Sequence, residues 1–174
     1  KKSLIENVIF ENLSNPNFED WSVPGAVTFY YSPVEILNCI FKDNQSEDGL
    51  NIVKSSFSIK NTKFLTTSSD ALDIDFSDGL IENVLIYKPG NDGLDISGSN
   101  VSVTNMNVED SLDKAISIGE ASELNALDIF VKDSFIALAS KDSSKVNINN
   151  FIIESTDIGF TLFQKKKEYS LPSQ

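Results

Sequence analysis

Aspartate side chains recur at a fixed interval in the middle of this 174-residue sequence. They occupy three columns of a repeat: the position just before a small residue, and the positions two and four residues after it. The aspartates of these columns are Asp48, Asp70, Asp73, Asp75, Asp92 and Asp95. Two such carboxylates on stacked strands would repel each other by roughly 3 kcal/mol at an effective dielectric constant near 20. Because a cation relieves this repulsion, and oxygen-only ligands suit Ca²⁺ better than zinc, we predict that these six residues hold Ca²⁺.

Amide and lysine side chains extend the same three columns. Asn51 precedes Asp73 and Asp95 in one column, Lys114 follows Asp92 in another, and Lys141 continues the third. Such groups form hydrogen bonds with sugar hydroxyls, so we expect a polysaccharide to bind at Asn51, Asp73, Asp95, Lys114 and Lys141. A solvated acidic face without a ligand is the alternative. The confinement of the aspartates to one face and three coils favours a functional site.

Aromatic residues lie next to this face in the sequence. Asn7 and Asn38 are 31 residues apart, and the extra length falls in a long loop of the first coil, residues 11–25. This loop contains Trp21, the only tryptophan of the chain, and Tyr30 and Tyr31 follow it closely. Aromatic rings stack on the C–H faces of sugars, so we expect all three residues to contribute to polysaccharide binding. Trp21 could equally cover the open N-terminal coil as a hydrophobic cap.

The repeat itself predicts the elements that must position these side chains. A small residue returns every 22 positions at Gly49, Ala71, Gly93, Ala115, Ala137 and Gly159. Each unit contains two short segments of alternating apolar and polar residues bounded by turn-forming residues, which indicates strands. A propeller blade needs a longer unit, and leucine-rich repeats have their own leucine spacing. We therefore predict an all-β fold, a single-stranded right-handed parallel β-helix of about seven 22-residue coils.

Stacking the coils gives each column a structural role. Apolar columns form buried files, such as Leu72, Leu94 and Ile116. An asparagine column is expected at a turn, where side-chain amides can form a ladder. We expect residues 1–174 to form one β-helix domain, a monomeric module of a larger protein, with residues 164–174 as a C-terminal cap or tail. Cys39 lies in a largely apolar column and is expected to be a buried, inert thiol.

The charge of the chain restricts its partners. The net charge is −12, with 14 basic and 26 acidic residues and no histidine; every basic residue is a lysine. This argues against nucleic acids and anionic membranes as partners, and against a polyanionic substrate unless metal ions bridge the charges. The sequence shows neither a signal peptide nor a membrane-spanning segment, so no membrane insertion is expected.

Two segments one coil apart resemble the catalytic coils of polygalacturonases. Residues 91–96 (NDGLDI) and 113–118 (DKAISI) are similar to the Asn-Thr-Asp-Gly and Asp-Asp-Cys patterns of that family. The resemblance implies that Asp92 and Asp113 are cleft carboxylates. Lys114 replaces the second aspartate of the pair, and the histidine and Arg-x-Lys motifs of the family are absent. Because glycoside hydrolysis requires both an acid and a base or nucleophile, hydrolysis is not expected.

A second resemblance covers nearly the whole chain. The strings GAVTFYYSPVEI, SSDALDIDFSDG, NDGLDISGSNV and LDKAISIGEAS are similar to β-helix domains beside spore-coat-H-like kinase domains in bacterial surface proteins. This resemblance implies a pectin-lyase-like fold and a secreted or cell-surface location. The same fold occurs in polysaccharide lyases, in which aspartates hold Ca²⁺ and a lysine abstracts a proton.

Three functions remain open at this point. The favoured one is a non-catalytic carbohydrate-binding module for a plant-type polysaccharide such as xylan, with Ca²⁺. The second is a Ca²⁺-dependent polysaccharide lyase or epimerase with Lys114 as the base and with Asp92 and Asp113 in the cleft. The third is a structural or adhesive spacer at the cell surface, whose acidic face keeps the solenoid soluble.

Overall fold

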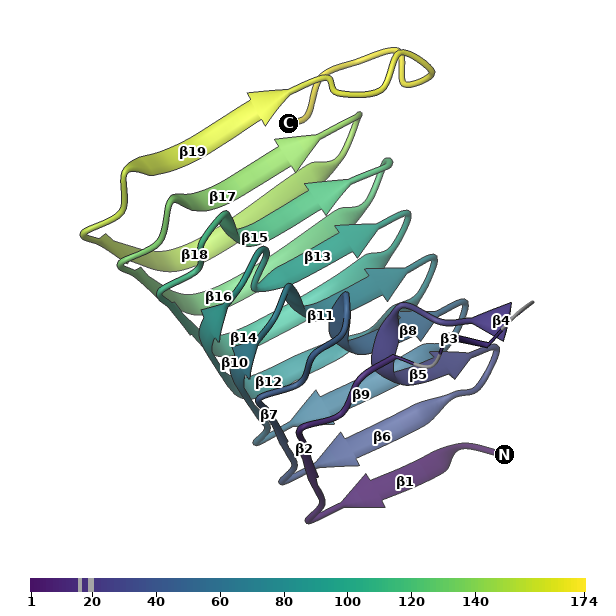
Figure 1. Ribbon diagram of the computed structural model, residues 1–174. Coiled ribbons are helices and arrows are strands. Elements are labelled where there is room, and N and C mark those ends of the chain that lie inside the picture. Colours follow the sequence, from purple (N-terminus) through teal and green to yellow (C-terminus); the bar gives the residue numbers. More distant parts are fainter. Residues whose placement is uncertain (16, 19–20) are drawn as a thin grey trace.

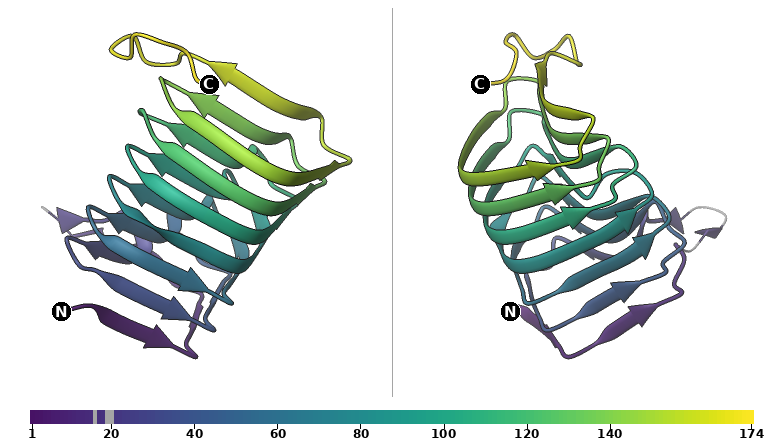
Figure 2. Two further views of the ribbon diagram at one scale, coloured as in Figure 1. Left: turned by 180° about the vertical axis from the view of Figure 1, so that it is seen from behind. Right: turned by 90° about the vertical axis from the view of Figure 1, so that its left-hand side faces the viewer.

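The chain winds into a stack of parallel β-coils, with the N-terminus at one end and the C-terminus at the other (Figure 1). The computed structural model describes residues 1–15, 17, 18 and 21–174, with the backbone alone at 17, 18 and 21. The colours follow the chain from coil to coil along the stack in all three views (Figures 1 and 2). Every strand pair of the stack is parallel, which confirms the predicted β-helix architecture.

Two walls of the stack are formed by sheets of the described residues. The seven-stranded sheet consists of β5 (Gly25–Tyr30), β8 (Asp48–Val53), β11 (Asp70–Asp75), β13 (Leu94–Ser97), β15 (Lys114–Gly119), β17 (Ile136–Lys141) and β19 (Ile158–Phe163). The other sheet contains β1 (Ser3–Glu6), β6 (Val34–Leu37), β9 (Ser56–Lys60), β12 (Asp78–Pro89), β14 (Asn100–Glu109), β16 (Glu123–Lys132) and β18 (Lys145–Glu154). The strands β2 (Ile9–Glu11), β7 (Ile40–Lys42) and β10 (Lys63–Thr67) join this sheet along the last part of β12.

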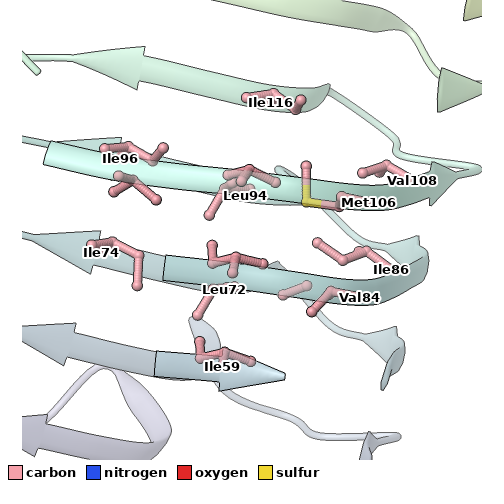
Figure 3. Packing of buried hydrophobic residues seen from close by; sticks show 14 of the residues in the cluster. Ile59, Leu72, Ile74, Val84, Ile86, Leu94, Ile96, Met106, Val108 and Ile116 are labelled. Carbon is pink, nitrogen blue, oxygen red and sulfur yellow. The ribbon is translucent and has the colours of Figure 1, made fainter. Parts of the chain in front are cut away.

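Apolar side chains of equal register fill the interior. Leu94 lies between Leu72 and Ile116 in the strand register, and all three are fully buried. Figure 3 shows these files packing against Ile86, Val108 and Met106 from the opposite wall. The rings of Phe10, Phe41 and Phe64 stack with centroids 4.7 and 4.8 Å apart. The predicted files are therefore the core, and Cys39 is buried among them as predicted.

Residues with a left-handed backbone conformation turn the chain at the corners of the coils. Asn38, Asn61, Asn83 and Asn105 have φ between 50° and 55°, a region that asparagine tolerates better than most residues. The side-chain amide of each donates a hydrogen bond to the amide oxygen of the preceding coil, for example Asn105 Nδ2 to Asn83 Oδ1 at 2.8 Å. Asp128 takes the next place and accepts a bond from Asn150. The predicted asparagine ladder is therefore present.

A second ladder, which was not predicted, runs through buried serines. The hydroxyl oxygens of Ser55, Ser77, Ser99, Ser122 and Ser144 each accept a hydrogen bond from a backbone N–H of the preceding coil, at 2.8–3.2 Å. All five serines are at most 5% exposed. The hydroxyls thus satisfy backbone donors at a corner where the sheet ladder is interrupted.

Two segments depart from the regular coil. In the long first coil, β3 (Asn17–Phe18) pairs antiparallel with β4 (Trp21–Ser22). At the other end, the C-terminal tail returns to the stack: Gln174 exchanges backbone hydrogen bonds with the segment from Ser144 to Val146. Within the described part of the chain, the structure contains no helix long and apolar enough to cross a membrane.

Candidate functional site

The middle strands of the seven-stranded sheet present the predicted aspartates. The register pairs Asp70 with Asp48, and Asp73 with both Asn51 and Asp95. Leu72 and Ile74 point into the core from the same strand, so Asp73 and Asp75 lie on its outer side. The alternation of the strand and the 22-residue period therefore gather the six aspartates onto adjacent coils, as the sequence predicted.

Three of these carboxylates come together at the start of β11 and β13. Asp70, Asp92 and Asp95 each offer one oxygen, and these oxygens all lie within 4.8 Å of one another. Oδ1 of Asp70 accepts hydrogen bonds from the backbone N–H of Asp92 at 2.8 Å and from the Asn91 amide at 2.6 Å. Oδ1 of Asp92 accepts the backbone N–H of Lys114 at 3.0 Å. Backbone bonds of this kind fix the two carboxylates in place.

A second group of polar side chains lies one coil earlier. The amide nitrogen of Asn51 donates to Asp73 Oδ2 at 3.0 Å and to Asp75 Oδ2 at 3.3 Å. Asn51 is fully buried, and its amide oxygen has no hydrogen-bond partner among the described residues. The same holds for buried Oδ2 of Asp48 and Oδ1 of Asp95. Three oxygen acceptors thus lack a donor in one acidic region, an arrangement that costs free energy in the absence of a ligand.

Burial and mutual repulsion raise the pKa values of these carboxyl groups. Burial, followed by the charge of Asp70, raises the pKa of Asp48 to about 8. Burial also raises the pKa of Asp70 to about 6, against the lowering effect of the N–H bond from Asp92. The pKa values of Asp73 and Asp75 are raised by burial, in Asp73 with the charge of Asp48 as the next cause. Removal from water therefore favours the protonated forms, and a bound cation would favour the ionised forms instead.

Lys114 is tied to two carboxylates. Its ammonium nitrogen lies 3.0 Å from Asp92 Oδ1 and forms a second, shorter contact with Asp113. Burial lowers the pKa of Lys114, but the hydrogen bond to Asp113 and the charge of Asp92 outweigh it, so the net pKa is raised. Burial raises the pKa of Asp92, with the charge of Lys114 opposing it. A lysine with a raised pKa stays protonated at neutral pH, which disfavours its use as a general base.

Lys141 on β17 points back to β15, the adjacent strand. Its ammonium donates to the hydroxyl of Ser117 at 2.7 Å, and its stem passes over Gly119, which lacks a side chain. Lys141 is only 9% exposed and Ser117 is fully buried. The predicted role of Lys141 in binding a sugar requires an accessible ammonium, whereas the structure buries the group against the sheet.

The predicted aromatic residues divide into two groups. Tyr30 and Tyr31 are 58% and 63% exposed, with ring centroids 4.7 Å apart and nearly perpendicular planes. The side chain of Trp21 lies outside the described residues, so its two interpretations both remain predictions.

The sequence analysis identified only Tyr31 in one column of residues at the edge of this face. This column lies five residues after each small residue and contains Tyr31, Lys54, Phe76 and Gly98, all with positive φ. Phe76 is 54% exposed. The signal in the sequence was Gly98, because a glycine at a recurrent position indicates a left-handed corner for the whole column.

Comparison with known proteins supports the fold. The family model "Right handed beta helix region" matches residues 48–169. Among solved structures, that of QnrB1, a plasmid-mediated fluoroquinolone resistance protein, aligns over 88% of this chain and 91% of that chain. Its identity is 12% and its TM-score 0.18, a likeness too low to support an argument. A search of curated proteins found no match. The family match covers most of the sequence, and the chain belongs to the right-handed β-helix family.

Proposed function

We propose that this β-helix is a non-catalytic carbohydrate-binding module that recognises a plant-type polysaccharide, with xylan as the favoured ligand. The observation that carries the proposal is the close approach of Asp70, Asp92 and Asp95 on the outer face of the sheet. The exposed rings of Tyr30 and Tyr31 lie at the other end of the parallel strands of this sheet. Polar groups and aromatic rings on one sheet provide the two kinds of contact that sugars use, hydrogen bonds and stacking. A neutral or weakly charged chain fits a protein of net charge −12 better than pectin does.

The proposal includes a Ca²⁺ ion among the aspartates. The donors are all oxygens, which suit this hard cation, and Ca²⁺ accepts six to eight such ligands. Asp70, Asp92 and Asp95 would supply the protein ligands, and waters or sugar hydroxyls would complete the set. The unpartnered oxygen of Asp95 is consistent with such a ligand. The ion would favour the ionised carboxylates and connect them to the polysaccharide.

The two alternative functions have less support. For a lyase or epimerase, Lys114 would have to lose its proton, and its ion pairs with Asp92 and Asp113 oppose this. For a spacer, the close approach of Asp70, Asp92 and Asp95 would have no use. As a binding module, the chain would act in a secreted or cell-surface protein, as a monomer fused to other domains.

Calorimetry with oligosaccharides tests the proposal directly. We expect xylohexaose to bind in about 1 mM Ca²⁺, the weak end of the dissociation constants of extracellular Ca²⁺ modules. Binding should weaken in excess EDTA. Saturating Ca²⁺ alone should stabilise the fold by about 2–3 kcal/mol at a hundredfold excess over its dissociation constant. Asp95→Asn should remove the stabilisation.

Asp128→Asn is the matched control, because it makes the same change of charge at an exposed corner outside the site. Binding of no oligosaccharide in a panel of xylan, mannan, cellulose and pectin fragments would refute the proposed function. Release of unsaturated uronates that is abolished in Lys114→Ala would establish the lyase instead.

A further inference from the structure

One corner of the solenoid carries bulky side chains where the backbone is least suited to them. The corner ledge, as we call it, consists of Tyr31, Lys54, Phe76 and Gly98, which occupy the same place in four consecutive coils. Their φ angles are 48°, 48°, 49° and 60°. Side chains with a Cβ disfavour this region, and for large residues it is a genuine outlier. Gly98 shows that glycine fits the corner without strain.

The two aromatic residues of the ledge bury only part of their rings against the protein. Tyr31 is 63% and Phe76 54% exposed, so neither buries its ring in the core. Lys54 lies over the Tyr31 ring at 5.4 Å, and the Phe76 ring rests on Gly98, where an added Cβ would come within 2.5 Å of it. Each ring thus has one side supported by the protein and substantial area facing solvent. Strained, exposed aromatic residues point to a role outside the fold itself.

The spacing of the rings suits a linear ligand. Tyr31 and Phe76 are separated by one coil, that of Lys54, so they lie two strand spacings or about 9.6 Å apart along the stack. This distance is comparable with the disaccharide repeat of an extended β-1,4-linked glycan. A chain parallel to the axis of the solenoid could therefore place a pyranose ring on each aromatic ring.

Hydrogen-bonding groups adjoin the ledge on its strand side. Asp75 directly precedes Phe76 and accepts a bond from Asn51, which also bonds Asp73. Asp73 and Asp75 are half-buried on the outer side of this strand, where they can bond the hydroxyls at the edge of a stacked sugar, whereas the fully buried Asn51 holds the two carboxylates in place. The carboxylates repel an anionic chain, which favours a neutral one.

From this arrangement we propose that the corner ledge is the stacking platform for a neutral, extended β-linked polysaccharide that runs along the axis of the solenoid. Tyr31 and Phe76 stack on alternate sugar units, Lys54 supports the Tyr31 ring, and the absence of a side chain at Gly98 leaves room for the Phe76 ring. The inference rests on the proposed carbohydrate-binding function and assigns its central contact to Phe76, a residue outside the aspartate columns.

Replacement of Phe76 by glycine separates binding from folding. Phe76→Gly removes the ring and relieves the corner, so the melting temperature should stay the same or rise by up to about 4 °C. Affinity for xylohexaose or cellohexaose should fall at least about tenfold, as expected for a central aromatic anchor. Phe76→Asn, which also tolerates a left-handed backbone, should give the same loss and guards against an effect peculiar to glycine.

Lys88→Gly is the matched control. Lys88 has φ 54° at a different corner, and its ammonium lies over the Tyr87 ring as that of Lys54 lies over Tyr31. Lys88→Gly should change the stability as Phe76→Gly does. Its affinity for the glycan should stay within about twofold of that of the wild type, as for a substitution that does not contact the ligand.

The outcomes distinguish the two levels of the proposal. If the wild type binds a glycan and both Phe76 variants bind it equally well, the ledge is not the platform, while the binding function stands. If the wild type binds none of the oligosaccharides, both proposals fail together. Phe76-dependent sedimentation with neutral lipid vesicles, without glycan binding, would replace the polysaccharide by a membrane surface and refute the inference.

Discussion

Asp48 is the most unusual single residue of the acidic face. It is 2% exposed, and one of its oxygens has no hydrogen-bond partner within the described chain. Its pKa, raised from 3.8 to about 8 by burial and by the charge of Asp70, keeps it protonated at neutral pH. The folded chain therefore holds a proton that the unfolded chain has already released. Proton binding of this kind stabilises the folded state only at low pH.

Because Asp48 is protonated in the folded state, we expect the free energy of unfolding to fall as the pH rises. Between about pH 4 and pH 8 the folded state binds more protons than the unfolded state at Asp48, so the free energy of unfolding decreases through this window. Asp48→Asn should flatten the decrease and stabilise the protein by about 2–4 kcal/mol at pH 8, because an amide needs no proton to be neutral. Urea denaturation in EDTA at pH 4, 6 and 8 measures the effect.

Asp128→Asn serves again as the control and should leave the slope unchanged. A free energy of unfolding that rises between pH 4 and pH 8 in both the wild type and Asp48→Asn would contradict the assignment of a raised pKa to Asp48.

The sequence alone could predict which side chains lie close together. It could not predict their burial or their backbone conformation. The repeat placed Asp70, Asp73 and Asp95 on one face, and the register brings them onto adjacent coils. The burial of Lys141 was not predictable, because it depends on the direction of a long side chain across Gly119. The left-handed conformation of Phe76 was not predicted for a related reason: it is a property of the corner and not of phenylalanine.

At the scale of elements, side chains at the corners form the hydrogen bonds that backbone groups form within the strands. Strands of adjacent coils bond each other directly, and between them the asparagine and serine ladders continue the bonding around the turn. The asparagine ladder was predictable because asparagine both tolerates the left-handed region and carries a donor and an acceptor. The serine ladder was not, because serine is common in loops for many reasons.

Loss of one serine hydroxyl should have a measurable cost. Ser99 is 1% exposed, and its hydroxyl accepts the backbone N–H of Ser77 at 2.8 Å. Ser99→Ala leaves this buried donor without a partner, so we expect a loss of about 1–3 kcal/mol in the free energy of unfolding. Ser102→Ala, on the exposed side of β14, should change it by less than about 0.5 kcal/mol. Equal effects of the two substitutions would show that the ladder is dispensable.

On the scale of the whole molecule, the contacts among the described strands are mainly between neighbouring coils, and each end coil has a neighbour on one side. The interior of the last coil opens into a hollow of about 270 Å³ lined by Leu138, Ile148 and Phe160, among others. Phe160 is 55% exposed, whereas its counterparts Leu72 and Leu94 in the middle coils are fully buried. The stack is therefore best packed in the middle, where the acidic face lies.

Hydrogen exchange should reflect this gradient. We expect the slowest amide exchange in β11, β13 and β15, and exchange faster by an order of magnitude or more in β1 and β19, because end coils can open without disturbing the rest. Mass spectrometry of exchanged peptides resolves these strands. Equal protection from end to end would mean that the coils unfold as one cooperative unit.

The architecture was the part of this protein most accessible from sequence. Few folds are compatible with a 22-residue period and apolar columns, because equivalent apolar residues must be buried in the same way in every coil. The long first coil breaks the period, so the sequence predicted a loop at residues 11–25 but no strands within it. In its described part, β3 pairs antiparallel with β4, an arrangement that no repeat could specify.

That same first coil shows how the solenoid accommodates foreign sequence. Thirty-one residues separate Asn7 from Asn38, yet the Asn38 amide still reaches the Asn7 oxygen at 3.3 Å, and β2 and β7 still pair in register. The additional residues therefore do not shift the register of the coils that follow. Such a position in the coil is a suitable site for inserting foreign sequence. A peptide epitope or a second loop inserted at the same position of a later coil would be displayed on a rigid support without contacting the core.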